Sequence, residues 1–240
     1  MTAMTTLAGS DALQLARVLR HQSFGRGRPE KVTEPVVEPL WSGLRVIAAA
    51  QGGTGVLLDD GTELAEHEHL AQALAHAVAA TASGVIVDAY VTKQVANDQP
   101  GVYTGAEDDV PAVGAPLVGG LLGRGRRSKR EQLMEDRAVQ LAAEQFEDDD
   151  PVNLVAVDLL WLDGEWLLDA PLLERKRLLE AILPGDPLVR PSMFVRPPIE
   201  RWVGSWRAQG FRGLAFKGAN SRYRPGEVAS DWITHPMPRR

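Results

Sequence analysis

The sequence predicts an α+β domain in which helices flank antiparallel sheets. Tight-turn signals separate β-like apolar runs, as at Gly52-Gly53 and Asp163-Gly164. Stretches with helical spacing of apolar residues lie between these hairpins, but strands and helices do not alternate regularly. With 240 residues, 44% of them hydrophobic, the chain is long enough to bury one main core.

Composition excludes several kinds of site. The chain has no cysteine, which rules out disulfides, thiolate zinc sites and a cysteine nucleophile. Its formal net charge of −6 argues against a general phosphate-neutralising surface, so contact with nucleic acid would need a local basic patch. No apolar run of about 18 residues and no signal-peptide pattern occurs in the sequence. We therefore expect a cytoplasmic protein that does not enter the membrane, and no oligomeric state follows from the sequence.

The first ninety residues read as a small meander between two helices. Residues 11–20 carry apolar positions at helical spacing and are followed by a glycine-rich loop. Residues 44–50 and 55–58 are β-like runs around the first turn. Apolar side chains recur every four positions within residues 63–80, which predicts a helix, and residues 85–91 read as the next strand.

Residues 97–150 break this rhythm and read as an insertion. Its first half is rich in glycine, proline and acidic residues, and its second half predicts a helix. Between them lies a basic segment, which consists of Arg124, Arg126, Arg127, Lys129 and Arg130. The nearby glycines do not form a phosphate loop, because no Gly-Lys-Ser/Thr ending follows them. The basic segment is either a solvated loop or a contact for a nucleic acid or an acidic protein partner.

An orderly pattern returns after the insertion. Residues 152–162 read as an apolar strand, and residues 165–168 return from it through the second turn. Asp169 is expected to cap the helix that follows. A further amphipathic helix is predicted within residues 199–210, and residues 213–217 read as a short strand.

Three groups of residues resemble the motifs of one family. They are Val-Asp-Leu-Leu-Trp-Leu-Asp-Gly at 157–164 with the helix at 168–179, Gly-Phe-Arg-Gly-Leu-Ala-Phe-Lys at 210–217 with 221–226 and Trp232, and Glu-Pro-Leu-Trp-Ser-Gly-Leu-Arg at 38–45. In order and spacing they are similar to the adenylation domain of ATP-dependent DNA ligases, especially the bacterial repair type. On this resemblance, residues 1–33 form an N-terminal helix and loop, and residues 34–240 form the adenylation domain with its insertion at about 97–150.

The resemblance implies a nucleotidyltransferase fold like that of DNA ligases and capping enzymes, and a two-step chemistry. A lysine amine attacks the α-phosphate of ATP to give a lysyl-AMP, and the AMP then passes to a DNA 5′-phosphate. This chemistry needs a nucleophilic amine, cations that neutralise phosphate charge, and a metal ion. Ligases of this kind usually also carry an oligonucleotide-binding domain after the fifth motif, and we expect none here.

The motifs depart from the family pattern where the family contacts ATP. Leu40 stands at the position of the nucleophilic lysine, and Ser42 replaces the aspartate of the same motif. Five further positions differ from the family's nucleotide-contacting residues: Asp59, Tyr90, Val157, Arg212 and Thr234. Gly43, Arg45 and Lys217 are retained, and the two cations either hold an anion or form local ion pairs. The family's catalytic positions are therefore degenerate, no metal ligand is expected, and no cofactor is firmly implied; ATP and Mg²⁺ would be cofactors only if residual binding survives.

Three hypotheses follow. The first is a non-catalytic pseudo-ligase that acts as an interaction or ligand-binding module, with a protein or nucleic acid as partner in DNA repair. The second is a protein that still holds a nucleotide or a 5′-phosphate through Arg45, Lys217 and Arg212, without covalent chemistry. The third is a ligase with a relocated nucleophile, for which Lys31 and Lys93 are the nearest lysines in sequence.

Overall fold

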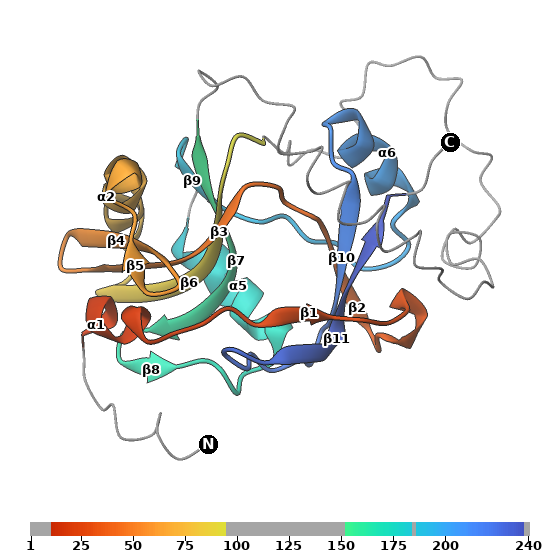
Figure 1. Cartoon of the computed structure of the whole chain (residues 1–240), viewed down its shortest axis with the longest axis horizontal. Coiled ribbons are helices and arrows are strands. Elements are labelled where there is room, and N and C mark those ends of the chain that lie inside the picture. The colour runs from red at the N-terminus through yellow and green to blue at the C-terminus, as the bar shows by residue number, and fades with distance from the viewer. Residues whose placement is uncertain (1–10, 95–151, 184–185, 238–240) are drawn as a thin grey trace.

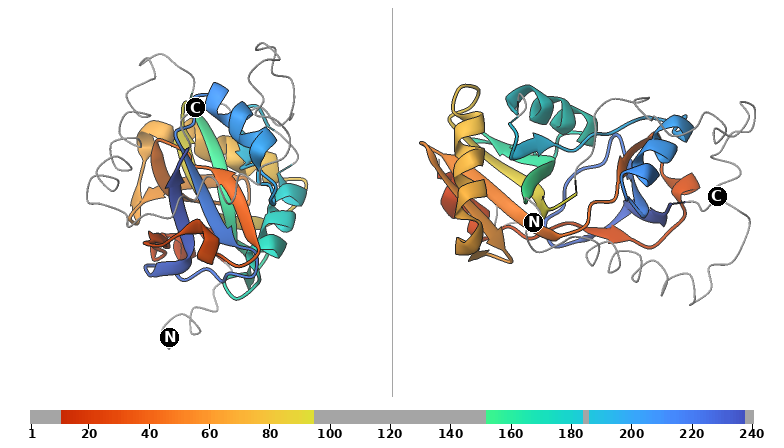
Figure 2. Two further views of the ribbon diagram at one scale, coloured as in Figure 1. Left: turned by 90° about the vertical axis from the view of Figure 1, so that its right-hand side faces the viewer. Right: turned by 90° about the horizontal axis from the view of Figure 1, so that it is seen from above.

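The computed structural model describes residues 11–94, 152–183 and 186–237, and within them the strands form two sheets (Figure 1). The larger sheet has the order β5-β4-β3-β6-β7-β8, with β9 pairing β7 in parallel. The smaller sheet has the order β1-β11-β10-β2. The two sheets lie beside each other along the long axis of the molecule (Figure 2).

The elements have the following bounds. The strands are β1 (Ser23–Gly25), β2 (Pro35–Pro39), β3 (Leu44–Gln51), β4 (Thr54–Asp59), β5 (Thr62–Glu63), β6 (Gly84–Thr92), β7 (Asn153–Leu162), β8 (Glu165–Trp166), β9 (Val189–Pro191), β10 (Gly213–Gly218) and β11 (Val228–Pro236). The helices are α1 (Ala12–Arg17), α2 (Glu68–Val78), α5 (Leu172–Ile182) and α6 (Glu200–Ala208), with short 3₁₀ turns η1 (Pro29–Lys31) and η2 (Ala65–His67).

The larger sheet follows from the hairpin signals. Gly52 and Gly53 adopt positive φ angles of 58° and 79°, which let β3 turn directly into β4. β3 also pairs antiparallel with β6 along its whole length, and alternate residues at its centre are buried in two different apolar clusters. α2 packs its apolar face, with Leu70 and Leu74 fully buried, against this sheet.

The predicted helices and strands up to residue 91, and those after residue 152, are confirmed. Five strands were missed, namely β1, β2, β5, β9 and β11. β2 contains two prolines and a buried glutamate, and β1, β5 and β9 have only two or three residues each. Such segments carry too little periodic signal for a strand and are fixed by the neighbours with which they pair.

The expected cap of α5 is wrong. Pro171 occupies the N-cap position and makes no side-chain cap bond, whereas the Asp169 carboxylate accepts a hydrogen bond at 3.0 Å from Arg222. The predicted helix in the insertion and the basic segment lie outside the described residues. None of the helices in the described part of the chain is both long and apolar enough to cross a membrane.

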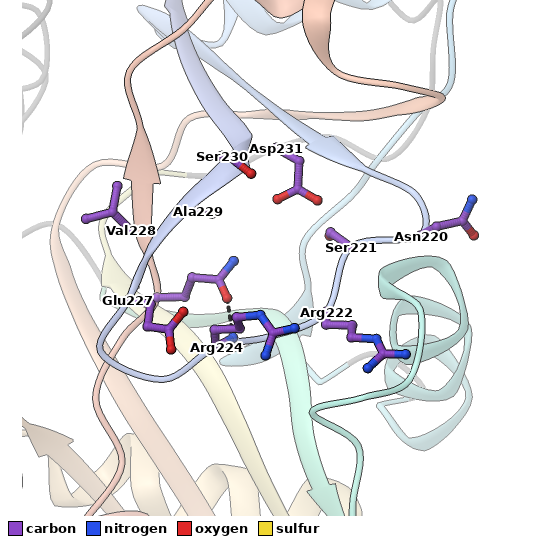
Figure 3. Close-up of a pocket in the computed structure, with 10 residues that line it drawn as sticks. Asn220, Ser221, Arg222, Arg224, Glu227, Val228, Ala229, Ser230 and Asp231 are labelled. Carbon is purple, nitrogen blue, oxygen red and sulfur yellow. Dashed lines mark hydrogen bonds between the residues drawn. The ribbon is translucent and has the colours of Figure 1, made fainter. Parts of the chain in front are cut away.

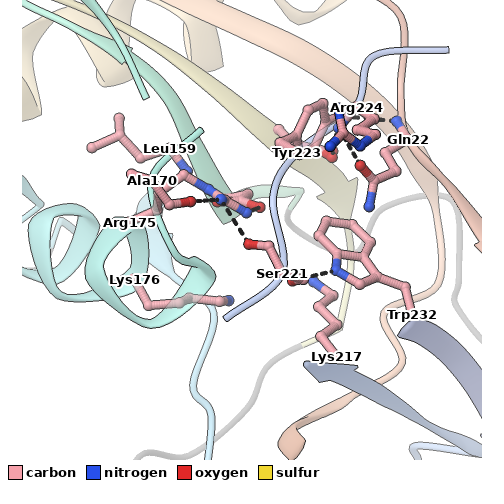
Figure 4. A network of polar contacts seen from close by, with 12 residues as sticks. Gln22, Leu159, Ala170, Arg175, Lys176, Lys217, Ser221, Tyr223, Arg224 and Trp232 are labelled. Carbon is pink, nitrogen blue, oxygen red and sulfur yellow. Dashed lines mark hydrogen bonds and ion pairs between the residues drawn. The ribbon is translucent and has the colours of Figure 1, made fainter. Parts of the chain in front are cut away.

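A buried ion pair links the larger sheet to the connection between β10 and β11. Arg175 of α5 donates two hydrogen bonds of 2.8 Å to the carboxylate of Asp158 in β7, and both side chains are fully buried. The same guanidinium also donates to the Ser221 carbonyl at 3.2 Å (Figure 4). Because every contact is buried and directed, Arg175 fixes how the connection after β10 sits on the larger sheet.

Candidate functional site

Leu40 follows β2 and packs against the start of β10. Its backbone N–H donates to the Gly213 carbonyl at 2.9 Å, and a Cβ built on Gly213 would lie 2.9 Å from Leu40 Cδ2. The side chain is half-buried. An alkyl side chain in this place cannot act as a nucleophile.

Glu38, on β2 two residues before Leu40, is the centre of a buried charged cluster. One carboxylate oxygen, Oε1, lies 2.9 Å from Lys176 Nζ and 3.0 Å from Lys217 Nζ. The other oxygen, Oε2, accepts a 3.2 Å hydrogen bond from the Ser192 hydroxyl, which in turn accepts one from the Trp41 indole. We call these five residues the Glu38 cluster.

Arg45 belongs to a second cluster, centred on Asp88 of β6. Arg45 donates to both oxygens of the Asp88 carboxylate, at 2.9 and 2.5 Å. Tyr223 donates its hydroxyl to Asp88 at 2.9 Å, and His21 Nδ1 lies 3.4 Å from the carboxylate. Burial alone would raise the pKa of Asp88, but the charges of Arg45 and His21 outweigh it and hold the pKa far below its usual value.

Of the side chains suggested to bind a phosphate, the structure pairs two with carboxylates. Lys217 contacts Glu38 and Arg45 contacts Asp88, so both have the internal ion pairs that were the alternative to anion binding. Arg212 is exposed just before β10 and does not enter either cluster.

The other substituted positions are spread around the two sheets. Ser42 is buried, and its backbone N–H donates to the Gln94 side chain at 2.8 Å. Tyr90 is half-buried, with the Arg45 guanidinium 5.9 Å from its ring centroid; burial raises the pKa of its phenol. Val157 is buried in the apolar core, and Thr234 is half-buried in β11.

Neither lysine suggested as a relocated nucleophile belongs to the Glu38 cluster. Lys31 lies exposed in η1, and Lys93 lies half-buried after β6. Lys176 of α5 meets Glu38 instead. Its helical spacing could have indicated this, since Lys176 lies four residues after Leu172 and three before Leu179, both of which are buried.

A polar pocket of about 390 Å³ opens beside the connection between β10 and β11 (Figure 3). Its lining includes Gln22, Arg224 and Asp231. The Gln22 side-chain oxygen accepts a hydrogen bond from the Arg224 backbone. Arginines and carboxylates line it together, so the pocket presents no single charge to a ligand.

Comparison with known proteins finds matches in one family. The model of the ATP dependent DNA ligase domain matches residues 122–234, which include β7, α5, β10 and most of β11. The multifunctional non-homologous end joining protein LigD of Mycolicibacterium smegmatis is 37% identical over 82 residues. A DNA ligase of Methanothrix thermoacetophila is 33% identical over 86 residues.

The chain resembles the adenylation domain of ATP-dependent DNA ligases. The two alignments cover 34% and 35% of the chain, but only 11% and 15% of the M. smegmatis and Methanothrix proteins.

Solved structures agree on the fold of the chain. The ligase domain from M. tuberculosis LigD matches 92% of the chain with a TM-score of 0.60 at 21% identity, and the match covers 60% of that structure. The ATP-dependent ligase from bacteriophage T7, in complex with ATP, matches 93% of the chain with a TM-score of 0.50 at 14% identity. The expected nucleotidyltransferase fold is therefore confirmed, with no oligonucleotide-binding domain among the described residues.

Proposed function

We propose that this chain is a non-catalytic pseudo-ligase that acts in the cytoplasm as an interaction module in DNA repair. It keeps the nucleotidyltransferase fold and does not form a lysyl-AMP. Its partner is a nucleic acid or a protein that contacts the outer surface of the domain.

One observation carries this proposal: Leu40 replaces the amine, and Glu38 and Asp88 neutralise the retained cations of the same motifs. Lys217 and Arg45 are each held at ion-pair distance from a buried carboxylate. A phosphate would have to displace these carboxylates before it could use either cation. The arrangement therefore lacks both the nucleophile and the open cationic site that adenylation requires.

Intact-mass measurement after incubation with ATP and Mg²⁺ tests the absence of adenylation. We expect no AMP adduct on the wild-type chain, while a catalytically active ligase treated in parallel becomes adenylated. The Leu40→Lys variant restores the amine alone, and we expect it to stay unmodified because Lys217 and Arg45 are still paired. An adduct on the wild-type chain, mapped by peptide analysis to Lys176 or any other lysine, refutes the proposal.

A thermal-shift titration with ATP and AMP separates the pseudo-ligase from a protein that still binds nucleotide. A ligand that binds only the folded state raises the melting temperature by mass action. We expect no shift for the wild-type chain at millimolar nucleotide. A saturable shift that disappears in Lys217→Met would instead favour the hypothesis of nucleotide binding without covalent chemistry.

Binding to nicked DNA at several salt concentrations tests the nucleic-acid partner. The test variant replaces the basic segment with glutamines at Arg124, Arg126, Arg127, Lys129 and Arg130, and the control replaces exposed basic residues elsewhere, at Arg26, Lys31, Arg177, Arg201 and Arg212. For every phosphate that the basic segment neutralises, its replacement should lower the slope of log K against log salt by about 0.9. If the two variants have the same slope as the wild-type chain, the basic segment does not bind phosphate and a protein partner is favoured.

A further inference from the structure

The Glu38 cluster contains more positive than negative charge in a place that water does not reach. The side chains of Glu38 and Lys176 are each 1% exposed, and that of Lys217 is 3% exposed. The two ammonium groups share the single oxygen Oε1 of Glu38. Figure 4 shows Lys176 on α5 and Lys217 on β10.

The carboxylates nearest in the fold are already engaged by other cations. Asp88 is bound by Arg45 and Tyr223, and Asp158 is bound by Arg175. Glu38 is thus the single carboxylate in ion-pair contact with either lysine in the described part of the chain. A buried cation without a counter-ion is strongly unfavourable, so both lysines depend mainly on this group, although the charge of Asp158 also favours the charged form of Lys176.

The titration behaviour agrees with this geometry. Burial alone would raise the pKa of Glu38, but the two lysines outweigh it and lower the pKa below its usual value. Burial lowers the pKa of Lys176, and the charge of Lys217 lowers it further, although Glu38 partly offsets both. The Lys176 ammonium also has no well-directed hydrogen bond among the described residues, so its contact with Glu38 is an ion pair only.

Aromatic rings complete the surroundings of both lysines. Lys217 Nζ lies 4.6 Å from the ring centroid of Trp232, and Lys176 Nζ lies 5.6 Å from that of Phe194. A ring face attracts an ammonium group but cannot neutralise its charge. The cluster therefore has the composition of an anion site, with cations over aromatic faces, in which the resident anion is a side chain of the same protein.

The cluster also joins the two sheets. Glu38 and Lys217 belong to β2 and β10 of the smaller sheet, whereas Lys176 comes from α5, which packs on β7 of the larger sheet. The Lys176–Glu38 ion pair therefore spans the space between the sheets. Any anion that replaced the Glu38 carboxylate would have to enter this space.

We propose that the Glu38 carboxylate is a built-in counter-anion that occupies the cationic site between the two sheets and thereby excludes the phosphate groups of external ligands. This inference rests on the proposed function, because it explains how a domain that does not adenylate itself keeps Lys217 without binding a nucleotide. Removal of the carboxylate exposes a site for a small phosphate anion.

Four proteins test the proposal by thermal shift and by isothermal titration calorimetry, with inorganic pyrophosphate as the probe. They are the wild-type chain, Lys176→Met, Glu38→Ala/Lys176→Met, and Glu38→Ala/Lys176→Met/Lys217→Met; alanine also removes the side chain that fills the site. The Lys176→Met change leaves a neutral Glu38–Lys217 pair, and the triple variant leaves no charge in the cluster. In the double variant Lys217 has no carboxylate partner, so this protein alone should bind an anion.

We expect pyrophosphate to bind the double variant at least about tenfold more tightly than any of the other three, which is the affinity equivalent of one charge-assisted hydrogen bond. Equal binding by the wild-type chain and the double variant overturns the proposal, as does a folded double variant that does not bind. If the double variant does not unfold cooperatively, Glu38→Ala/Lys217→Met presents Lys176 to the same probe with the same expected result.

These outcomes are independent of the adenylation test. An AMP adduct on the wild-type chain refutes the pseudo-ligase function whatever pyrophosphate does to the variants. Absence of the adduct together with absence of binding to the folded double variant leaves the pseudo-ligase function standing and refutes the role of Glu38.

Discussion

Replacing Glu38 with glutamine removes the one carboxylate that faces two buried lysines. Glutamine has nearly the same shape and can still accept a hydrogen bond from Ser192, so the change is one of charge. Breaking a buried ion pair by removing one partner costs about 3–5 kcal/mol, because the other partner stays buried and uncompensated. For a chain of this size each kcal/mol corresponds to about 2–4 °C, so we expect the melting temperature to fall by about 6–20 °C.

Lys176→Met is the matched comparison. It removes one of two cations that share a carboxylate and leaves a neutral pair, and replacement of a buried ion by an apolar group of similar volume is often close to neutral. We expect this variant to stay within about 1 kcal/mol of the wild-type chain. In the Glu38→Gln background the same change should recover part of the stability, because one uncompensated cation is removed.

These differences are measured by urea unfolding followed by circular dichroism. The four proteins compared are the wild-type chain, Glu38→Gln, Lys176→Met and the variant that combines the two substitutions. The midpoints and slopes together give the free energies of unfolding, provided that the transitions are two-state. A decrease below about 1 kcal/mol for Glu38→Gln would mean that the lysines do not need the carboxylate. A decrease in Lys176→Met as large as that in Glu38→Gln would mean that the pair is held by packing and not by charge.

Three further predictions concern other parts of the fold. Asp158→Asn should cost about 3–5 kcal/mol in urea unfolding because Arg175 is left buried without its partner, and adding Arg175→Met should recover a large part of this; equal stability of the two variants would contradict the prediction. Gly55→Ala should cost about 1–3 kcal/mol, since its Cβ would lie 1.9 Å from a backbone oxygen of α2, whereas the control Gly204→Ala in α6 meets nothing within 4 Å and should be neutral or stabilising. Because the pKa of Asp88 is lowered in the folded state, its stabilising effect is present above its unfolded pKa of about 3.9 and is lost as the pH falls through the folded pKa; the acid decline of the melting temperature should therefore be shallower in Asp88→Asn.

The sequence predicts helices and strands correctly where the pattern of apolar residues extends over several positions. β3, β4, β6 and β7 are continuous apolar runs bounded by turn residues, and α2 has one clear apolar face. β2 and β11 could not be read in the same way. They are strands because β10 pairs with both of them, and such pairing is a property of distant parts of the chain.

The site was predicted only in part, for a related reason. The motif positions identify Leu40 and Ser42 as residues that lack the amine and the carboxylate of the family pattern, since side-chain chemistry is a local property. The partners of Arg45 and Lys217 were left open between an anion and an internal ion pair. In the folded chain, Arg45 pairs with Asp88 and Lys217 pairs with Glu38. The sequence had identified Glu38 only as part of the first motif.

The sequence by itself determined the resemblance to the ligase family, the α+β class and the absence of a lysine at position 40, because motif residues and hydrophobic periodicity are carried by short segments. The tertiary structure alone decided that Lys176, from a helix more than a hundred residues after Glu38, meets the same carboxylate as Lys217. Ion pairing between buried groups depends on distances that arise only when the two sheets come together, and on the removal of water that makes one carboxylate indispensable to two cations.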